Sequence, residues 1–172
     1  MLETDMSLLI PDNYVSNFNE RLALYKDLDS LQSEKQLKAF EGRLRDRFGK
    51  MPQQVTELIY AVRLRWLARK AGIVKILLKA AKMKAYFYET KDERFFNSEV
   101  YGRILQYVFS NPKTCIMKQS DKGQLYIVFA GIETVESGVN LLKGLVEAEV
   151  ANEGRSDNGS FKGTSKKSGE IC

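Results

Sequence analysis

The chain has 172 residues, of which 44% are hydrophobic and 28% charged, a balance typical of one globular domain with a sizeable core. It contains no histidine, which excludes the commonest general base, the commonest zinc ligand and any Ser-His or Cys-His nucleophile pair. It also lacks the glycine motifs G-x-x-x-x-G-K-[ST] and G-x-G-x-x-G, which cradle phosphates. We therefore expect a binding or regulatory domain rather than an enzyme, with no cofactor or metal of its own.

The net charge of +5 is unevenly distributed along the chain. Between Glu57 and Glu89 there is no acidic residue, although the segment holds many lysines and arginines. Such a block favours nucleic acid or an acidic protein surface as a partner. The first ten residues include acids where an export signal needs bases, and no apolar run is long enough for a membrane span. We expect a cytoplasmic protein that does not contact a membrane.

Residues 3 to 10 are expected to form an extended lead, and two amphipathic helices follow it. The first helix begins at a cap, Ser16 or Asn17, and repeats apolar residues at helical spacing. The residues expected on its buried face are Phe18, Leu22, Tyr25 and Leu28. The second helix begins at Ser33, whose hydroxyl is expected to accept from the third helical amide while Gln36 reaches back, a capping box. The residues expected on its buried face are Leu37, Phe40, Leu44 and Phe48.

A glycine-proline corner separates the second helix from a third. Gly49 is expected to end the second helix, and Pro52 to occupy the first turn of a helix over about residues 53 to 71. The third helix carries two apolar stripes about 150° apart. One stripe holds Val55, Ile59, Val62 and Trp66, and the other holds Leu64, Leu67 and Ala71. Because a helix with two apolar sides needs two partners, we expect it to be central.

After Gly72 the apolar period changes to two, which predicts strands. A first hairpin is expected around the turn "KAAK", and a second joins "TCIMKQ" to "QLYIVFA" through "SDKG". The residues expected to face inward on the first hairpin are Val74, Ile76, Leu78, Met83, Ala85 and Phe87. A helix capped near Asn97 or Ser98 lies between the hairpins, and a last helix runs from about 134 to 150.

These elements predict an α+β fold, with three N-terminal helices packed with two β-hairpins in a small antiparallel sheet and two further helices. Residues 1–151 are expected to form the single domain. Residues 152–172 are rich in Gly, Ser, Lys and Asn and nearly empty of apolar residues, so we predict a disordered polar tail.

Three motifs in this order resemble the C-terminal domain of bacterial transcription-repair coupling factors, over roughly residues 5 to 90. The family pattern contains an Asn-x-Arg-Leu-x-x-Tyr helix, an Asp-Arg-Phe-Gly-x-x-Pro junction and a Leu-Arg-x-x-Ala-x-x-x-Gly-Ile run. The matching residues are Asn19, Arg21, Leu22 and Tyr25; Asp46, Arg47, Phe48, Gly49 and Pro52; and Leu64, Arg65, Ala68, Gly72 and Ile73.

The resemblance implies a role within a large ATP-driven DNA translocase that releases stalled RNA polymerase and recruits the excision-repair protein UvrA. ATP and Mg would belong to the motor of that parent protein, outside this chain. The domain itself is expected to be non-catalytic, to dock on the UvrB-like N-terminal region, and so to inhibit UvrA binding and motor activity. UvrA, RNA polymerase and DNA would be indirect partners, reached through the parent protein.

Docking requires an exposed polar surface, and the second helix offers one. Arg43, Asp46 and Arg47 lie at i, i+3 and i+4, opposite the apolar stripe and beside the glycine-proline corner. We predict that this charged ridge is the interdomain contact, because such charges set register and association rate. The alternative is a solvated helix face without a partner.

The acid-free block supports a different function, direct binding of DNA or RNA. The candidate residues are Arg63, Lys70, Lys75, Lys79, Lys84, Tyr86 and Tyr88. Lysines would neutralise phosphates while the tyrosines stack on bases. The alternative is that the lysines protect an exposed sheet edge, which the tyrosines half-cover.

Overall fold

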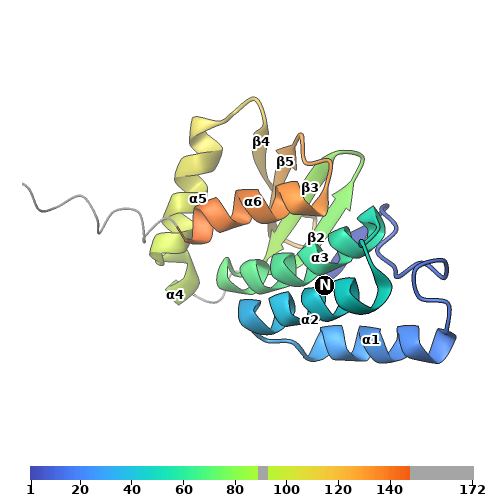
Figure 1. The fold of residues 1–172 in the computed structure, drawn as a ribbon. Helices are drawn as coiled ribbons and strands as arrows, with labels where there is room; N and C mark the ends of the chain where they lie inside the picture. The colour runs from blue at the N-terminus through green and yellow to red at the C-terminus, as the bar shows by residue number, and fades with distance from the viewer. Residues whose placement is uncertain (89–92, 148–172) are drawn as a thin grey trace, which may run out of the picture.

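The computed structural model describes residues 1–88 and 93–147 (Figure 1). The elements are β1 (Leu2–Thr4), α1 (Phe18–Ser30), α2 (Glu34–Phe48), α3 (Gln53–Lys70), β2 (Ile73–Lys79), β3 (Lys82–Phe87), α4 (Glu93–Phe96), α5 (Glu99–Ser110), β4 (Cys115–Gln119), β5 (Leu125–Ala130) and α6 (Val135–Val146). The predicted α+β class is confirmed, as are both hairpins and the order of the three N-terminal helices. The predicted tail, 152–172, lies outside the described residues.

The strands form a single five-stranded mixed sheet in the order β1-β2-β3-β5-β4. The two hairpins are joined through the antiparallel pair β3 and β5. Strand β1 adds to the edge of the first hairpin, parallel to β2, with Leu2 opposite Ile76. The sequence indicated only an extended lead here, because a three-residue strand is too short to show a period. The short helix α4 was also not predicted.

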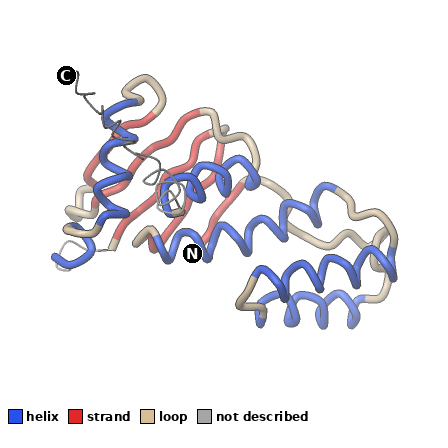
Figure 2. Tube along the Cα trace, turned by 60° about the vertical axis from the view of Figure 1, so that its left-hand side comes forward, coloured by secondary structure: helices blue, strands red, loops and turns tan. Residues whose placement is uncertain are grey.

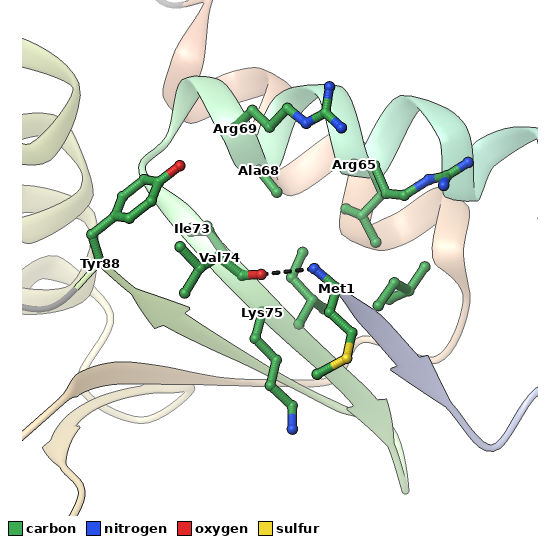
Figure 3. Close-up of a pocket in the computed structure, with 11 residues that line it drawn as sticks. Met1, Arg65, Ala68, Arg69, Ile73, Val74, Lys75 and Tyr88 are labelled. Carbon is green, nitrogen blue, oxygen red and sulfur yellow. Dashed lines mark hydrogen bonds between the residues drawn. The ribbon is translucent and has the colours of Figure 1, made fainter. Parts of the chain in front are cut away.

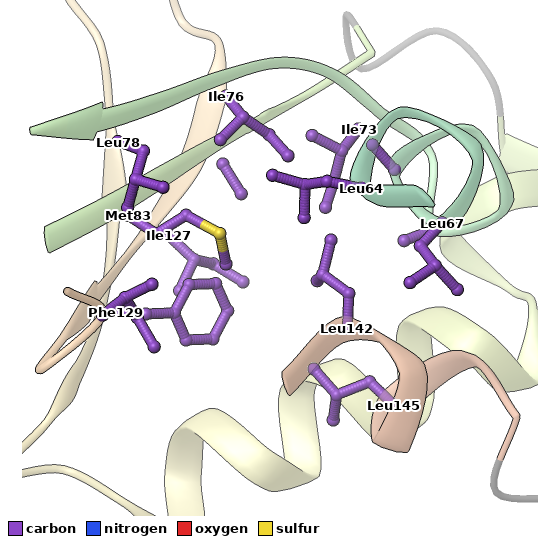
Figure 4. Packing of buried hydrophobic residues seen from close by; sticks show 14 of the residues in the cluster. Leu64, Leu67, Ile73, Ile76, Leu78, Met83, Ile127, Phe129, Leu142 and Leu145 are labelled. Carbon is purple, nitrogen blue, oxygen red and sulfur yellow. The ribbon is translucent and has the colours of Figure 1, made fainter. Parts of the chain in front are cut away.

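Helices α3, α5 and α6 pack on one face of the sheet, while α1 and α2 lie on the far side of α3 (Figures 1 and 2). Two hydrophobic clusters result. The larger lies between the sheet and α3, α5 and α6, and includes Leu64, Leu78, Met83, Ile127 and Leu142 (Figure 4). The smaller lies among the N-terminal helices.

Helix α3 contributes to both clusters, so its predicted central position is confirmed. Leu64, Leu67 and the C-cap residue Ala71 lie in the larger cluster, whereas Val55, Ile59 and Val62 are buried in the smaller one. Trp66, which was expected to be buried with Val55, Ile59 and Val62, is only half-buried. Among the described ranges, no helix has both the length and the apolar character needed to cross a membrane.

The buried face predicted for α1 is partly wrong. Leu28 is buried, but Phe18 is 63% exposed and Leu22 is 43% exposed. The reason is that the later part of the helix supplies most of its contacts with the smaller cluster, through residues such as Leu24, Tyr25 and Leu28. The cap is Asn17, whose side chain accepts from the Glu20 amide.

Two further local predictions need correction. Ser33 caps α2 as expected. The Gln36 side chain, however, accepts from the Gln32 amide (2.8 Å) and not from the Ser33 amide, so the predicted capping box does not form. In β2 the register shifts between Ile73 and Lys75, so Ile73 is buried and Val74, expected inward, is half-buried. A bulge adds one residue to one strand, which turns the following side chains to the other face.

Candidate interdomain surface

Helix α2 separates an apolar face from a charged one. Leu37, Phe40 and Leu44 are buried in the smaller cluster. Arg43, Asp46 and Arg47, the residues of the predicted ridge, are all exposed. Their spacing places them together on the helix surface, since residues three and four apart are neighbours. The structure therefore presents the ridge to solvent.

The two arginines of the ridge are already held by neighbouring side chains. Arg47 forms an ion pair with Glu20 of α1, and its guanidinium carbon lies 5.2 Å from the centroid of the Phe48 ring. The guanidinium carbon of Arg43 lies 5.8 Å from the centroid of the Phe40 ring. Such contacts orient an arginine while leaving other N–H donors for a partner.

Asp46 differs from both arginines. Within the part of the chain that the structure describes, its side chain makes no hydrogen bond and no ion pair. It also lies in the last turn of α2, where the partial negative charge of the helix C-terminus disfavours a carboxylate. Asp46 thus has no hydrogen bond or ion pair among the described residues, and its place in the last turn disfavours a negative charge.

The corner beside the ridge is fixed by its backbone and by Tyr14. Gly49 has φ 81° and ψ −158°, a region that essentially only glycine occupies. The Tyr14 hydroxyl donates to the Gly49 carbonyl (2.9 Å), and the Tyr14 ring packs against Phe48 with centroids 5.7 Å apart. Burial raises the pKa of the Tyr14 hydroxyl, which keeps it a donor. Sequence reasoning missed Tyr14, because no fixed spacing links it to the corner.

Other residues of the three motifs have structural roles. Arg21 donates to the carbonyls of Val15 (2.7 Å) and Ser16 (3.1 Å), which ties α1 to the preceding segment. The Tyr25 hydroxyl accepts from the Ile10 amide at 2.6 Å. Gly72 has φ 69°, and a side chain there would lie 2.3 Å from the Phe95 ring. These contacts explain the motif residues as parts of the fold.

The residues predicted to bind nucleic acid are not all on one surface. Lys75, Lys79, Lys84 and Tyr86 lie on the sheet face opposite the helices, since they alternate with buried residues of β2 and β3. Arg63 and Lys70 belong to α3, which packs on the other face. The Arg63 guanidinium binds Glu34 (2.7 Å) and Glu41 (3.2 Å), so its charge is matched inside the domain.

Tyr88 lies beyond the end of β3 and lines a shallow hollow between β2 and α3 (Figure 3). The hollow also holds Arg65, Arg69 and the Met1 ammonium, which donates to the Val74 carbonyl at 2.7 Å. It contains no carboxylate, and nowhere in the described ranges do three or more His, Cys, Asp or Glu side chains gather as they would around a metal ion. We assign no chemistry to it.

The comparisons with known proteins agree with the motifs. The profile of the TRCF domain family matches residues 4–98, more than half of the chain. The chain belongs to the TRCF domain family.

The curated relatives of this TRCF domain are transcription-repair-coupling factors. That of Borreliella burgdorferi is 27% identical over 148 residues, which cover 83% of this chain and 13% of that protein. That of Escherichia coli K12 is 37% identical over 75 residues, which cover 44% of this chain and 6% of that protein. The chain therefore spans only a small part of the length of these relatives.

The fold of the TRCF domain has also been solved in a relative. A crystal structure of the C-terminal domain of transcription-repair coupling factor superimposes with a TM-score of 0.68, covering 88% of this chain and 94% of that one. The sequences are 18% identical, so this likeness establishes the shared fold.

Proposed function

We propose that this TRCF domain is a docking and regulatory module of a transcription-repair coupling factor. In this role it binds the UvrB-like N-terminal region of the same protein through the ridge Arg43, Asp46 and Arg47. The bound domain masks the surface that receives UvrA and restrains the ATP-driven motor. RNA polymerase and DNA are then reached through the motor, and the protein acts in the cytoplasm.

Asp46 is the observation that carries this proposal. Its carboxylate is exposed, lacks a partner among the described residues and lies at the end of α2 that disfavours negative charge. Residues that break a local rule of stability without compensation are expected at functional positions. A cationic group on a partner would supply the missing contact, and the glycine-proline corner beside Asp46 would hold it in a fixed place.

Charge reversal on the ridge tests the docking surface. The chain is titrated against the purified UvrB-like region by isothermal titration calorimetry, with Asp46→Lys and Arg47→Glu as variants. Because a like charge opposite its partner costs several kcal/mol, we expect each variant to bind at least about tenfold more weakly. Matched controls are Asp27→Lys and Arg69→Glu, which make the same charge changes at exposed positions on α1 and α3.

A further variant separates docking from folding. Glu20→Gln removes the ion pair with Arg47 but leaves the arginine in place. If Arg47 contacts the partner, Glu20→Gln retains most of the affinity that Arg47→Glu loses. Unchanged affinity in both ridge variants would remove this surface from the proposal.

The proposed role requires no catalysis by this chain. ATP and Mg act in the motor, so the isolated chain is expected to show only background ATP hydrolysis. In the full-length coupling factor, Asp46→Lys is expected to raise both ATP hydrolysis and UvrA binding, because a released domain no longer restrains either. An intact protein whose two activities stay at their resting level would contradict the inhibitory part of the proposal.

A further inference from the structure

One face of the sheet is covered by helices, and the opposite face carries a patterned set of polar and aromatic side chains. The strand pairing aligns Lys75, Tyr86, Tyr126 and Lys118 in one row across β2, β3, β5 and β4. The inward neighbours of this row, such as Ala85 and Ile127, are fully buried, whereas none of its own members is. We call this surface the open face.

The centre of the open face is aromatic. The rings of Tyr86 and Tyr126 stack on each other, with centroids 4.9 Å apart and an angle of 22° between their planes. Both side chains are half-buried, and the neighbouring row holds Lys84 among three apolar residues, Leu77, Val128 and the 51% exposed Ile116. The centre therefore offers flat and apolar surface to a ligand.

Lysines surround this centre. Lys84 lies two residues before Tyr86 on the middle strand of the sheet, Lys118 ends the row on β4, and Lys82 lies at the turn of the first hairpin. Two carboxylates form contacts at the β1 edge. Glu3 binds Lys75 at 2.9 Å, and Asp5 accepts from the Ala80 amide at 3.0 Å. Within the described ranges, Lys82, Lys84 and Lys118 form no ion pair with a carboxylate.

Edge protection does not explain Lys84. The edges of the sheet are β1 and β4, whereas Lys84 lies on β3, which has a paired strand on each side. A lysine on a central strand protects no free backbone group. The role that the sequence left open as an alternative is thus excluded for Lys84.

We propose that the open face binds single-stranded nucleic acid, with bases stacked on Tyr86 and Tyr126 and phosphates contacted by Lys82, Lys84 and Lys118. Aromatic side chains beside a basic track form the usual platform for single strands, because every base has a face to stack. The row from Lys75 through Tyr86 and Tyr126 to Lys118 spans three strand spacings, about 14 Å. This is the length of about four stacked nucleotides. An acidic protein surface would gain from the lysines but has no comparable use for a stacked aromatic pair.

This surface revises the residue set expected from the sequence. Arg63 and Lys70 drop out because they belong to α3, and Tyr88 because it lines the hollow beside that helix. Tyr126 and Lys118 enter from the second hairpin, which the sequence did not associate with binding. The proposal is independent of docking, because the ridge lies on α2.

Fluorescence anisotropy with the full chain and labelled 12-nucleotide oligo(dT) and oligo(rU) tests the proposal. With three phosphate contacts, the logarithm of affinity is expected to fall with the logarithm of salt with a slope of about −2. Lys84→Gln with Lys118→Gln is expected to reduce that slope by about 1.4, because two contacts are lost. Tyr86→Leu with Tyr126→Leu is expected to weaken binding at least about fivefold at constant salt slope.

Matched variants distinguish this site from general basicity. Lys26→Gln with Lys50→Gln removes the same charge at exposed positions of α1 and the corner loop, and is expected to leave the affinity within about twofold. Circular dichroism checks folding, and the lysine variants, which alter only exposed or half-buried positions, remain informative if the tyrosine variants unfold. No binding at low salt overturns the proposal. Binding that neither the lysine nor the tyrosine double variant weakens would also overturn it, as would tighter binding of an acidic protein through the same lysines.

Discussion

Glu57 shows how one buried carboxylate joins distant parts of the chain. It is 6% exposed on α3, and it accepts from the Val135 amide at the start of α6 at 2.7 Å, across 78 residues of sequence. Its other oxygen accepts from the Gln53 side chain at 3.1 Å. The sequence marks Glu57 only as the limit of the acid-free block, because nothing local indicates that another helix begins beside it.

Removing this acceptor is expected to destabilise the domain. In Glu57→Ala the Val135 amide stays buried without a partner, so the free energy of unfolding should fall by about 1–3 kcal/mol. Glu57→Gln keeps an acceptor oxygen and should lose less. Urea unfolding followed by circular dichroism measures both, and equal stability of Glu57→Ala and the parent chain would show that the bond contributes nothing.

The ridge residue Asp46 is expected to behave in the opposite way. Asp46→Asn removes a negative charge from the last turn of α2, so it should leave stability unchanged or raise it by about 0.3–1 kcal/mol. The same change should weaken docking on the UvrB-like region. Thermal unfolding and calorimetry on one preparation measure the two effects, and a variant that loses both stability and affinity would indicate a structural residue instead.

The ion pair between Glu34 and Arg63 gives a prediction for pH. The hydrogen bond from Arg63 lowers the pKa of the Glu34 carboxyl below its ordinary value of 4.5. A group whose pKa is lower in the folded state stabilises the fold above its unfolded pKa, and this contribution is lost as the pH falls through the folded pKa. The pair should therefore stabilise the domain at neutral pH and lose its effect in acid.

Glu34→Gln should reveal this contribution. Because the Glu34 side chain is 47% exposed, we expect a loss of only about 0.2–1 kcal/mol at neutral pH, shrinking as the pH falls below 4.5. The control is Glu133→Gln, at an exposed position. Denaturant unfolding across this range measures the difference between variant and parent, and a difference that is constant with pH would exclude the ion pair as its source.

At the scale of elements, replacing a glycine by alanine should have opposite effects on stability inside α2 and at the corner that follows it. Gly49 has φ 81° and ψ −158°, so Gly49→Ala should cost about 1–3 kcal/mol and disturb the corner. Gly42 lies inside the helix, and a side chain added there meets no atom within 4 Å. Gly42→Ala should therefore stabilise by about 0.5–1 kcal/mol. Thermal unfolding compares them, and destabilisation by both would show that α2 tolerates no added methyl group.

Local signals predicted most of the elements. Asn17, Ser33, Ser98 and Gly49 mark helix ends as expected, because caps act within a few residues of their own backbone. Strand β1, which the sequence did not predict, depends on pairing with β2, more than seventy positions later. No local pattern indicates such a pairing. The set of nucleic-acid-binding residues predicted from the sequence was incomplete for the same reason. Tyr126 lies beside Tyr86 only because β5 pairs with β3.

At the scale of the whole molecule, α3 is the element on which both hydrophobic clusters depend. Amides around Ile59 and Leu67 should therefore exchange with solvent only by global unfolding, while those near Phe18 at the exposed start of α1 should exchange fastest among the helices. Hydrogen exchange followed by mass spectrometry measures this order. Earlier exchange in α3 than in α6 would show that the two clusters unfold as independent units.

Because α3 lies between the sheet and the other N-terminal helices, the ridge on α2 and the open face of the sheet are separate surfaces of the domain. A strand of nucleic acid on one would leave the other accessible, so the two ligands should form a ternary complex instead of competing. The domain would then bind the rest of its own protein through α2 and, at the same time, a nearby single strand of nucleic acid through the sheet.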